Sequence, residues 1–174
     1  MEYLKDCYSQ EELLISGLIN KKGNFVFNYH KLIIPYLENG KITYLRGRTL
    51  DLKSNLCKYI SLSNSSGNLS LKRFYNMETL KNIKSDESLF ICEGEFDTMI
   101  MEQRGYSAIG VPGVTNIPED KIHIIRNYKL YLAFDNDEAG QKAIRKMTTM
   151  INKTVIGIKL KKNKDVTELM CKNF

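Results

Sequence analysis

The order of strands and helices from residue 88 onward constrains this chain more than any other feature. Strand-like apolar runs occupy residues 88–92, 106–111, 128–134 and 154–160. Helical stretches lie between them at residues 96–103, 118–126 and 137–150. Strands that alternate with helices form βαβ units. The second half is therefore predicted to be an α/β domain with a mainly parallel four-stranded sheet and flanking helices.

The first half is patterned differently. Ser9 and Glu12 have the spacing of a capping box and predict a short helix that ends near Gly17. Strands are predicted at residues 24–27, 31–36 and 42–45, and Asn39-Gly40 between the last two is a strong hairpin signal. We therefore predict a hairpin-containing α+β subdomain over residues 1–86 and the α/β domain over residues 87–174.

Composition excludes several classes of protein. Of 174 residues, 43% are hydrophobic and 26% charged, as in an ordinary globular chain. No apolar run approaches the ~20 residues of a membrane span, and the start does not resemble a signal peptide. The four cysteines include no CxxC pair, so no zinc is expected in this chain, and free thiols in the cytoplasm are the default.

The positive charge is concentrated in one stretch. The net charge is +6, and residues 31–73 hold eight basic residues against two acidic ones. Tyr36, Tyr44 and Tyr59 are interleaved with these bases. Basic side chains with aromatic rings suit phosphate backbones and stacked bases. A lysine-rich solvated surface explains the charge alone equally well.

Acidic residues follow three of the predicted strands. They are Glu93, Glu95 and Asp97 after the first, Asp135, Asp137 and Glu138 after the third, and Asp165 and Glu168 after the fourth. The carboxyl ends of parallel strands share one edge of a sheet, where ligands bind. Carboxylates brought together there repel unless a hard cation such as Mg²⁺ lies between them. Helix capping is the alternative role, most obviously for Asp137.

These residues resemble a known family. The segments 93–97 (EGEFD) and 134–140 (FDNDEAG) resemble the EGxxD and DxDxAG motifs of Toprim domains in DnaG-type primases, and 164–169 (KDVTEL) is similar to their third acidic motif. Thr167 stands where that third motif has its second acid. The resemblance implies a Rossmann-like Toprim domain in which Glu93, Asp135 and Asp137 are catalytic and bind Mg²⁺ or Mn²⁺, supported by Asp165.

The upstream half is similar to the basic subdomain of the primase core. Residues 31–36 resemble its RIIFPI strand, 46–48 its GGR element and 58–61 its KYLN element. The resemblance implies nucleotide or template binding by basic residues of these elements and their neighbours. They are Lys31, Arg46, Arg48, Lys58 and Lys72.

The function implied is that of a DNA primase core, a nucleotidyltransferase that makes short RNA primers on single-stranded DNA from ribonucleoside triphosphates. A replicative helicase is an implied partner through regions outside this sequence, and no membrane is implied. Two alternatives remain at this point. One is a Toprim-type metal-dependent nuclease, which leaves the Arg48 and Lys58 elements unexplained. The other is a non-catalytic nucleic-acid-binding module.

Overall fold

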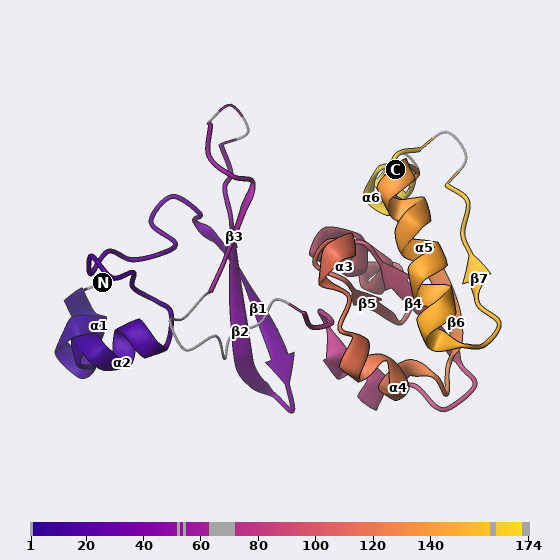
Figure 1. Ribbon diagram of the computed structural model, residues 1–174, viewed down its shortest axis with the longest axis horizontal. Coiled ribbons are helices and arrows are strands. Elements are labelled where there is room, and N and C mark those ends of the chain that lie inside the picture. Colours follow the sequence, from indigo (N-terminus) through magenta and orange to yellow (C-terminus); the bar gives the residue numbers. More distant parts are fainter. Residues whose placement is uncertain (1, 52, 54, 63–71, 161–162, 172–174) are drawn as a thin grey trace. The chain divides into compact units, whose positions relative to one another are not determined.

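The computed structural model of the chain describes residues 2–51, 53, 55–62, 72–160 and 163–171. The chain divides into two compact units, Met1–Leu71 and Lys72–Phe174. Figure 1 shows the elements of each unit.

The first unit begins with two short helices, α1 (Glu2–Cys7) and α2 (Gln10–Ile15). The capping box predicted for the second helix is confirmed. The Ser9 hydroxyl accepts the Glu12 N–H at 3.2 Å, and the Glu12 carboxylate accepts the Ser9 N–H at 2.8 Å. Helix α1 was not predicted, since its sequence offers no capping pattern at its start.

The centre of the first unit is an antiparallel sheet in the order β1–β2–β3. The strands are β1 (Leu32–Glu38), β2 (Lys41–Arg48) and β3 (Tyr59–Ser61). Asn39 and Gly40 join the first two strands with φ of 54° and 73°, the left-handed backbone of a two-residue hairpin turn. The predicted hairpin is therefore confirmed.

The strand predicted at residues 24–27 is wrong. Phe25 forms only an isolated bridge to Ile19. The Asn20 side chain accepts the N–H groups of residues 22 and 24, which folds the intervening chain into a tight turn. Phe27 is buried instead under Gly47, where an added Cβ would lie 2.5 Å from the Phe27 ring.

The second unit is built on a fully parallel sheet in the order β5–β4–β6–β7, which confirms the predicted α/β class. Its strands are β4 (Ser88–Cys92), β5 (Ala108–Gly110), β6 (Lys129–Ala133) and β7 (Ile156–Gly157). Its α-helices are α3 (Glu95–Gln103), α4 (Ile122–Ile125), α5 (Glu138–Ile151) and α6 (Val166–Cys171), and its 3₁₀ turns are η1 (Met77–Lys81), η2 (Val114–Asn116) and η3 (Glu119–Lys121).

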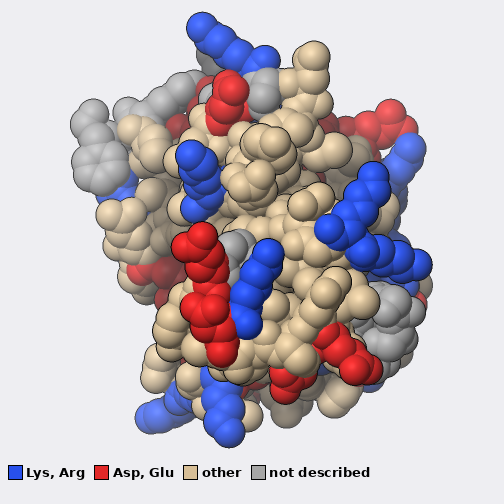
Figure 2. Space-filling model, turned by 90° about the vertical axis from the view of Figure 1, so that its left-hand side faces the viewer, with Lys and Arg blue, Asp and Glu red and all other residues tan. Residues whose placement is uncertain are grey.

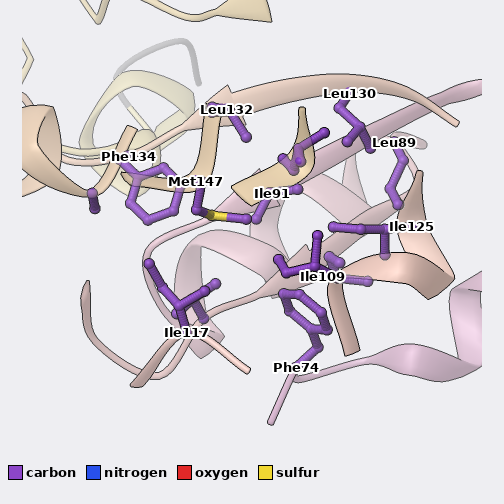
Figure 3. Close-up of a cluster of buried hydrophobic side chains, with 14 residues drawn as sticks. Phe74, Leu89, Ile91, Ile109, Ile117, Ile125, Leu130, Leu132, Phe134 and Met147 are labelled. Carbon is purple, nitrogen blue, oxygen red and sulfur yellow. The ribbon is translucent and has the colours of Figure 1, made fainter. Parts of the chain in front are cut away.

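Two apolar layers cover the sheet, because alternate strand residues point to opposite faces. Leu89, Ile91 and Leu132 pack with α4 and α5 in the larger core, which Figure 3 shows. Cys92 and Ala133 pack with α3 and α6 in the smaller one. The described helices include none long and apolar enough to cross a bilayer.

Residues just after Lys72 pack with the second unit. Phe74 is buried in the larger core, and the backbone of Tyr75 exchanges hydrogen bonds of 2.7 and 3.1 Å with Gly110. The Asn76 side chain donates to the Ala108 carbonyl at 2.9 Å. These contacts put the division of the chain at Leu71–Lys72, upstream of the boundary predicted near Asp86.

Candidate active site and basic cluster

Two acidic segments meet because their strands are neighbours. Strands β4 and β6 are parallel, with Cys92 opposite Ala133 at their carboxyl ends. Glu93 directly follows β4 and Asp135 is the second residue after β6, and the Glu93 Oε2 atom accepts the Asp135 N–H at 3.1 Å. The sheet thus places these two residues together, as the strand order predicts.

The third acidic segment is tied to both of the others. The Asn136 N–H donates to the Lys164 carbonyl at 2.7 Å. Thr167 donates its N–H and its hydroxyl to Asp97 Oδ1, at 2.9 and 2.7 Å. Residues 93–97, 135–137 and 164–167 therefore form a closed circuit of hydrogen bonds, which we call the acidic edge.

The carboxylates of the acidic edge act on one another electrostatically. Burial, followed by the negative charges of Glu93, Asp97, Asp165 and Asp137, raises the pKa of Asp135 from 3.8 to about 7. Burial also raises the pKa of Glu93, while the hydrogen bond from Asp135 and the charge of Lys164 oppose that rise. Half-buried carboxylates that destabilise each other's charge favour a cation.

Two acids of the acidic edge also cap helices. The Asp137 Oδ1 atom accepts the Gly140 N–H at 2.8 Å at the start of α5. The Asp165 Oδ1 atom accepts the Glu168 N–H at 2.7 Å at the start of α6. Each cap uses one of the two oxygens of a carboxylate. The capping role is therefore observed for Asp137 and Asp165, whereas Glu93 and Asp135 follow their strands without capping a helix.

The acidic edge offers the type of donor that a hard cation takes. Its predicted ligands Glu93, Asp135, Asp137 and Asp165 supply only carboxylate oxygens, which suit Mg²⁺ and Mn²⁺. No three His, Cys, Asp or Glu side chains of the described ranges are already arranged as a metal site. The chemistry of these donors therefore fits a divalent cation. A cation bound there would relieve the repulsion between Asp135 and the neighbouring carboxylates.

Three of the five predicted basic residues gather around one aromatic ring. The Arg46 Cζ atom lies 4.2 Å from the centroid of the Tyr59 ring, the Arg48 Cζ atom 5.4 Å and the Lys58 Nζ atom 5.8 Å. The sheet explains this arrangement, because Arg48 pairs with Tyr59 and Arg46 with Ser61 across β2 and β3. We call these four residues, Arg46, Arg48, Lys58 and Tyr59, the basic cluster.

The other two predicted basic residues lie elsewhere. Lys31 is exposed and immediately precedes β1 in the first unit. Lys72 belongs to the second unit, where its charge helps to lower the pKa of Glu119, after the larger effect of Lys146.

Of the three tyrosines interleaved with the bases, two are buried and present no ring to a ligand. Tyr36 and Tyr44 are 2% and 1% exposed and pack edge to face, with ring centroids 5.5 Å apart. Figure 2 shows lysine and arginine side chains interspersed with acidic ones on the face that it views.

Comparison with known proteins agrees with this architecture. Residues 90–170 match the Toprim-like family. A DNA primase of Campylobacter jejuni subsp. jejuni is 34% identical over 137 residues, which cover 73% of this chain and 22% of the relative.

Solved primase structures share the fold over nearly the whole chain. The Aquifex aeolicus primase, with its zinc-binding and RNA polymerase domains, matches 98% of this chain with 45% of its own (TM-score 0.81, 20% identity). A DnaG primase catalytic domain bound to single-stranded DNA matches 94% of this chain with 54% of its own (TM-score 0.76, 18% identity). This chain therefore spans less than a quarter of its curated relative and about half of these two structures.

The parallel sheet and the three acidic segments at its carboxyl edge define a Toprim-type α/β domain. More particularly, residues 90–170 match the Toprim-like family, and the chain has the fold of DnaG primase catalytic cores.

Proposed function

We propose that this chain supplies the nucleotidyl-transfer core of a DNA primase, which makes short RNA primers on single-stranded DNA during replication. The observation that carries the proposal is the acidic edge. It joins the three acidic segments by hydrogen bonds at the carboxyl end of the parallel sheet, in a chain with the fold of primase catalytic cores.

The acidic edge would hold Mg²⁺ or Mn²⁺ through Glu93, Asp135 and Asp137, with Asp165 in support. Such an ion, when bound, neutralises the charge of a triphosphate and favours ionisation of an attacking hydroxyl. Glu93 has a second candidate role, as the base that receives the proton of the 3′-hydroxyl. The raised pKa of its half-buried carboxyl group suits the base, whereas its carboxylate oxygens suit the ligand.

The basic cluster would bind the phosphates of the template or of an incoming ribonucleoside triphosphate. An arginine can hold two phosphate oxygens at once, whereas a lysine acts as a point charge. Arg46, Arg48 and Lys58 are already held near one ring, which limits the side-chain freedom lost on binding. Lys31 and Lys72 would add further positive charge, and a replicative helicase is a further partner that this function implies.

The experiment is ribonucleotide incorporation on single-stranded DNA with Mg²⁺ or Mn²⁺. The wild type is compared with Asp135→Asn, which removes one charge at constant size. Glu138→Gln is the matched control, because Glu138 directly follows this segment, is exposed, and forms a surface ion pair with Lys142 at 2.6 Å. We expect short RNA products from wild type and Glu138→Gln, and none from Asp135→Asn.

Each other outcome selects a different function. Metal-dependent shortening of the template, lost in Asp135→Asn, would identify a nuclease. Binding of single-stranded DNA without synthesis or cleavage, and unaffected by Asp135→Asn, would identify a binding module.

A further inference from the structure

The Asp97 carboxylate at the acidic edge accepts two hydrogen bonds from a single residue. Both donors of Thr167 converge on its Oδ1 atom, which fills the two lone pairs of that oxygen. The Oδ2 atom lies 3.8 Å from where a Cβ on Gly94 would stand, over the first turn of its own helix α3. The carboxylate of Asp97 is thus directed to the starts of α6 and α3.

The bond to Asp97 is one of two anchors on the third acidic segment. Lys164 is held from one side through its carbonyl by the Asn136 N–H. Thr167 is held from the other side by Asp97. Asp165 lies between these anchors, which restrict its movement while both are intact.

Apolar packing under α6 is incomplete. A hollow of about 140 Å³ lies between the helix, α3 and the sheet, and its lining includes Met101, Tyr106, Leu169 and Met170. Because dispersion contacts fall off steeply across a gap, this hollow removes part of the apolar contact that would otherwise hold the helix. Polar contacts hold α6 at both ends. Asp97 of α3 accepts hydrogen bonds at the start of α6. Arg104, the residue after α3, donates to the Met170 carbonyl near the end of α6 at 2.8 Å.

We infer that Asp97 and Thr167 form a latch that positions Asp165 at the acidic edge, and that Asp97 is a positioning residue and not a metal ligand. The effect of the latch on metal binding rests on the proposed function. The latch itself is a contact that can be tested without metal. The threonine side chain contributes the hydroxyl bond of this latch, and the backbone N–H contributes the other.

The variants separate hydrogen bonding from charge. Thr167→Val removes the hydroxyl donor at nearly constant shape, and Thr167→Ser restores it. Asp97→Asn removes the charge but keeps an oxygen that can accept both Thr167 donors. Arg104→Gln loosens the far end of α6 and is the matched control. Two measurements are made on the whole chain: Mg²⁺ affinity by calorimetry, and hydrogen exchange of the α6 amides in EDTA.

The latch predicts a specific combination of results. Thr167→Val should bind Mg²⁺ about tenfold more weakly, the lower end of the ~10–100-fold losses seen when partners of metal ligands are removed. Thr167→Ser and Asp97→Asn should stay within about threefold of wild type, a difference of ~0.7 kcal/mol or less. Arg104→Gln should speed exchange in α6 yet leave Mg²⁺ affinity unchanged.

Two results would overturn the inference. If Asp97→Asn loses Mg²⁺ binding as completely as Asp135→Asn, then Asp97 is a ligand. If Thr167→Val exchanges its α6 amides at the wild-type rate, then the Thr167 hydroxyl does not hold the helix and the latch as inferred is refuted. A wild type that binds no Mg²⁺ is a different failure: it refutes the proposed function, while the exchange experiment still decides whether the latch exists.

Discussion

At the scale of single residues, the absence of a side chain at Gly140 lets helix α5 lie close to the backbone of Asp135, a candidate metal ligand. A Cβ at this position would lie 2.2 Å from the Asp135 carbonyl oxygen. Alanine ordinarily stabilises a helix relative to glycine, but here the backbone of Asp135 would have to move. We expect Gly140→Ala to destabilise the protein by roughly 1–3 kcal/mol, the usual range for overpacking.

The measurement is thermal unfolding in EDTA. Gly157→Ala is the control, because no atom lies within 4 Å of a Cβ added there. A melting temperature that falls equally in both variants, or in neither, would contradict the argument.

The pKa of Asp135 predicts a pH dependence of stability without metal. The unfolded chain loses this proton near pH 3.8, whereas the native state keeps it until about pH 7. Between these values the native state binds more protons than the unfolded state, so the free energy of unfolding falls as the pH rises.

Asp135→Asn removes this titration. We expect its stability in EDTA to vary less than that of wild type between pH 4 and 7, measured by urea unfolding at several pH values. The prediction fails if the two proteins show the same pH dependence across that window.

At the scale of elements, the basic cluster on β2 and β3 predicts a salt-dependent contact. If Lys58 and Arg48 neutralise phosphates, Lys58→Gln and Arg48→Gln should each reduce the slope of log K against log salt by ~0.7 on single-stranded DNA. Lys53→Gln is the control, because Lys53 is an exposed lysine beyond the end of β2. An unchanged slope in the Arg48 and Lys58 variants would remove the basic cluster from the binding surface.

The sequence predicts those elements whose pattern is local. The parallel strands and helix α5 follow from apolar runs and a capping aspartate, and the hairpin follows from Asn39-Gly40. The last strand is shorter than its β-prone sequence, because only Ile156 and Gly157 pair with β6. Helix α6 was missed, although Asp165 and Glu168 have the spacing of a cap.

Contacts in the candidate site between residues far apart in the sequence could not be predicted from local patterns. Thr167 and Asp97 are 70 residues apart, so no local pattern links them. The strand order predicts that their segments approach each other, but the choice of partner depends on side-chain packing in the folded state. Local patterns also do not indicate that three cationic side chains lie near the Tyr59 ring, whereas Tyr36 and Tyr44 are buried.

At the scale of the whole molecule, the division at Leu71–Lys72 predicts where the chain can be cut. A segment of residues 72–174 keeps Phe74 in the larger core and the Tyr75 bridge to Gly110, whereas residues 87–174 lose both. We expect the longer segment to unfold cooperatively and the shorter one to be less stable by at least the ~3–5 kcal/mol of a buried phenylalanine. Urea unfolding of the two segments, followed by circular dichroism, is the measurement, and equal stability would place the boundary near Asp86.

The central claim is that the acidic edge binds a divalent cation, and calorimetric titration of Mg²⁺ into the whole chain tests it most directly. The wild type and Glu138→Gln should bind Mg²⁺ with equal affinity, while Asp135→Asn should lose at least tenfold in affinity. If Asp135→Asn binds Mg²⁺ as tightly as the wild type, or if the wild type does not bind it, the acidic edge is not a metal site.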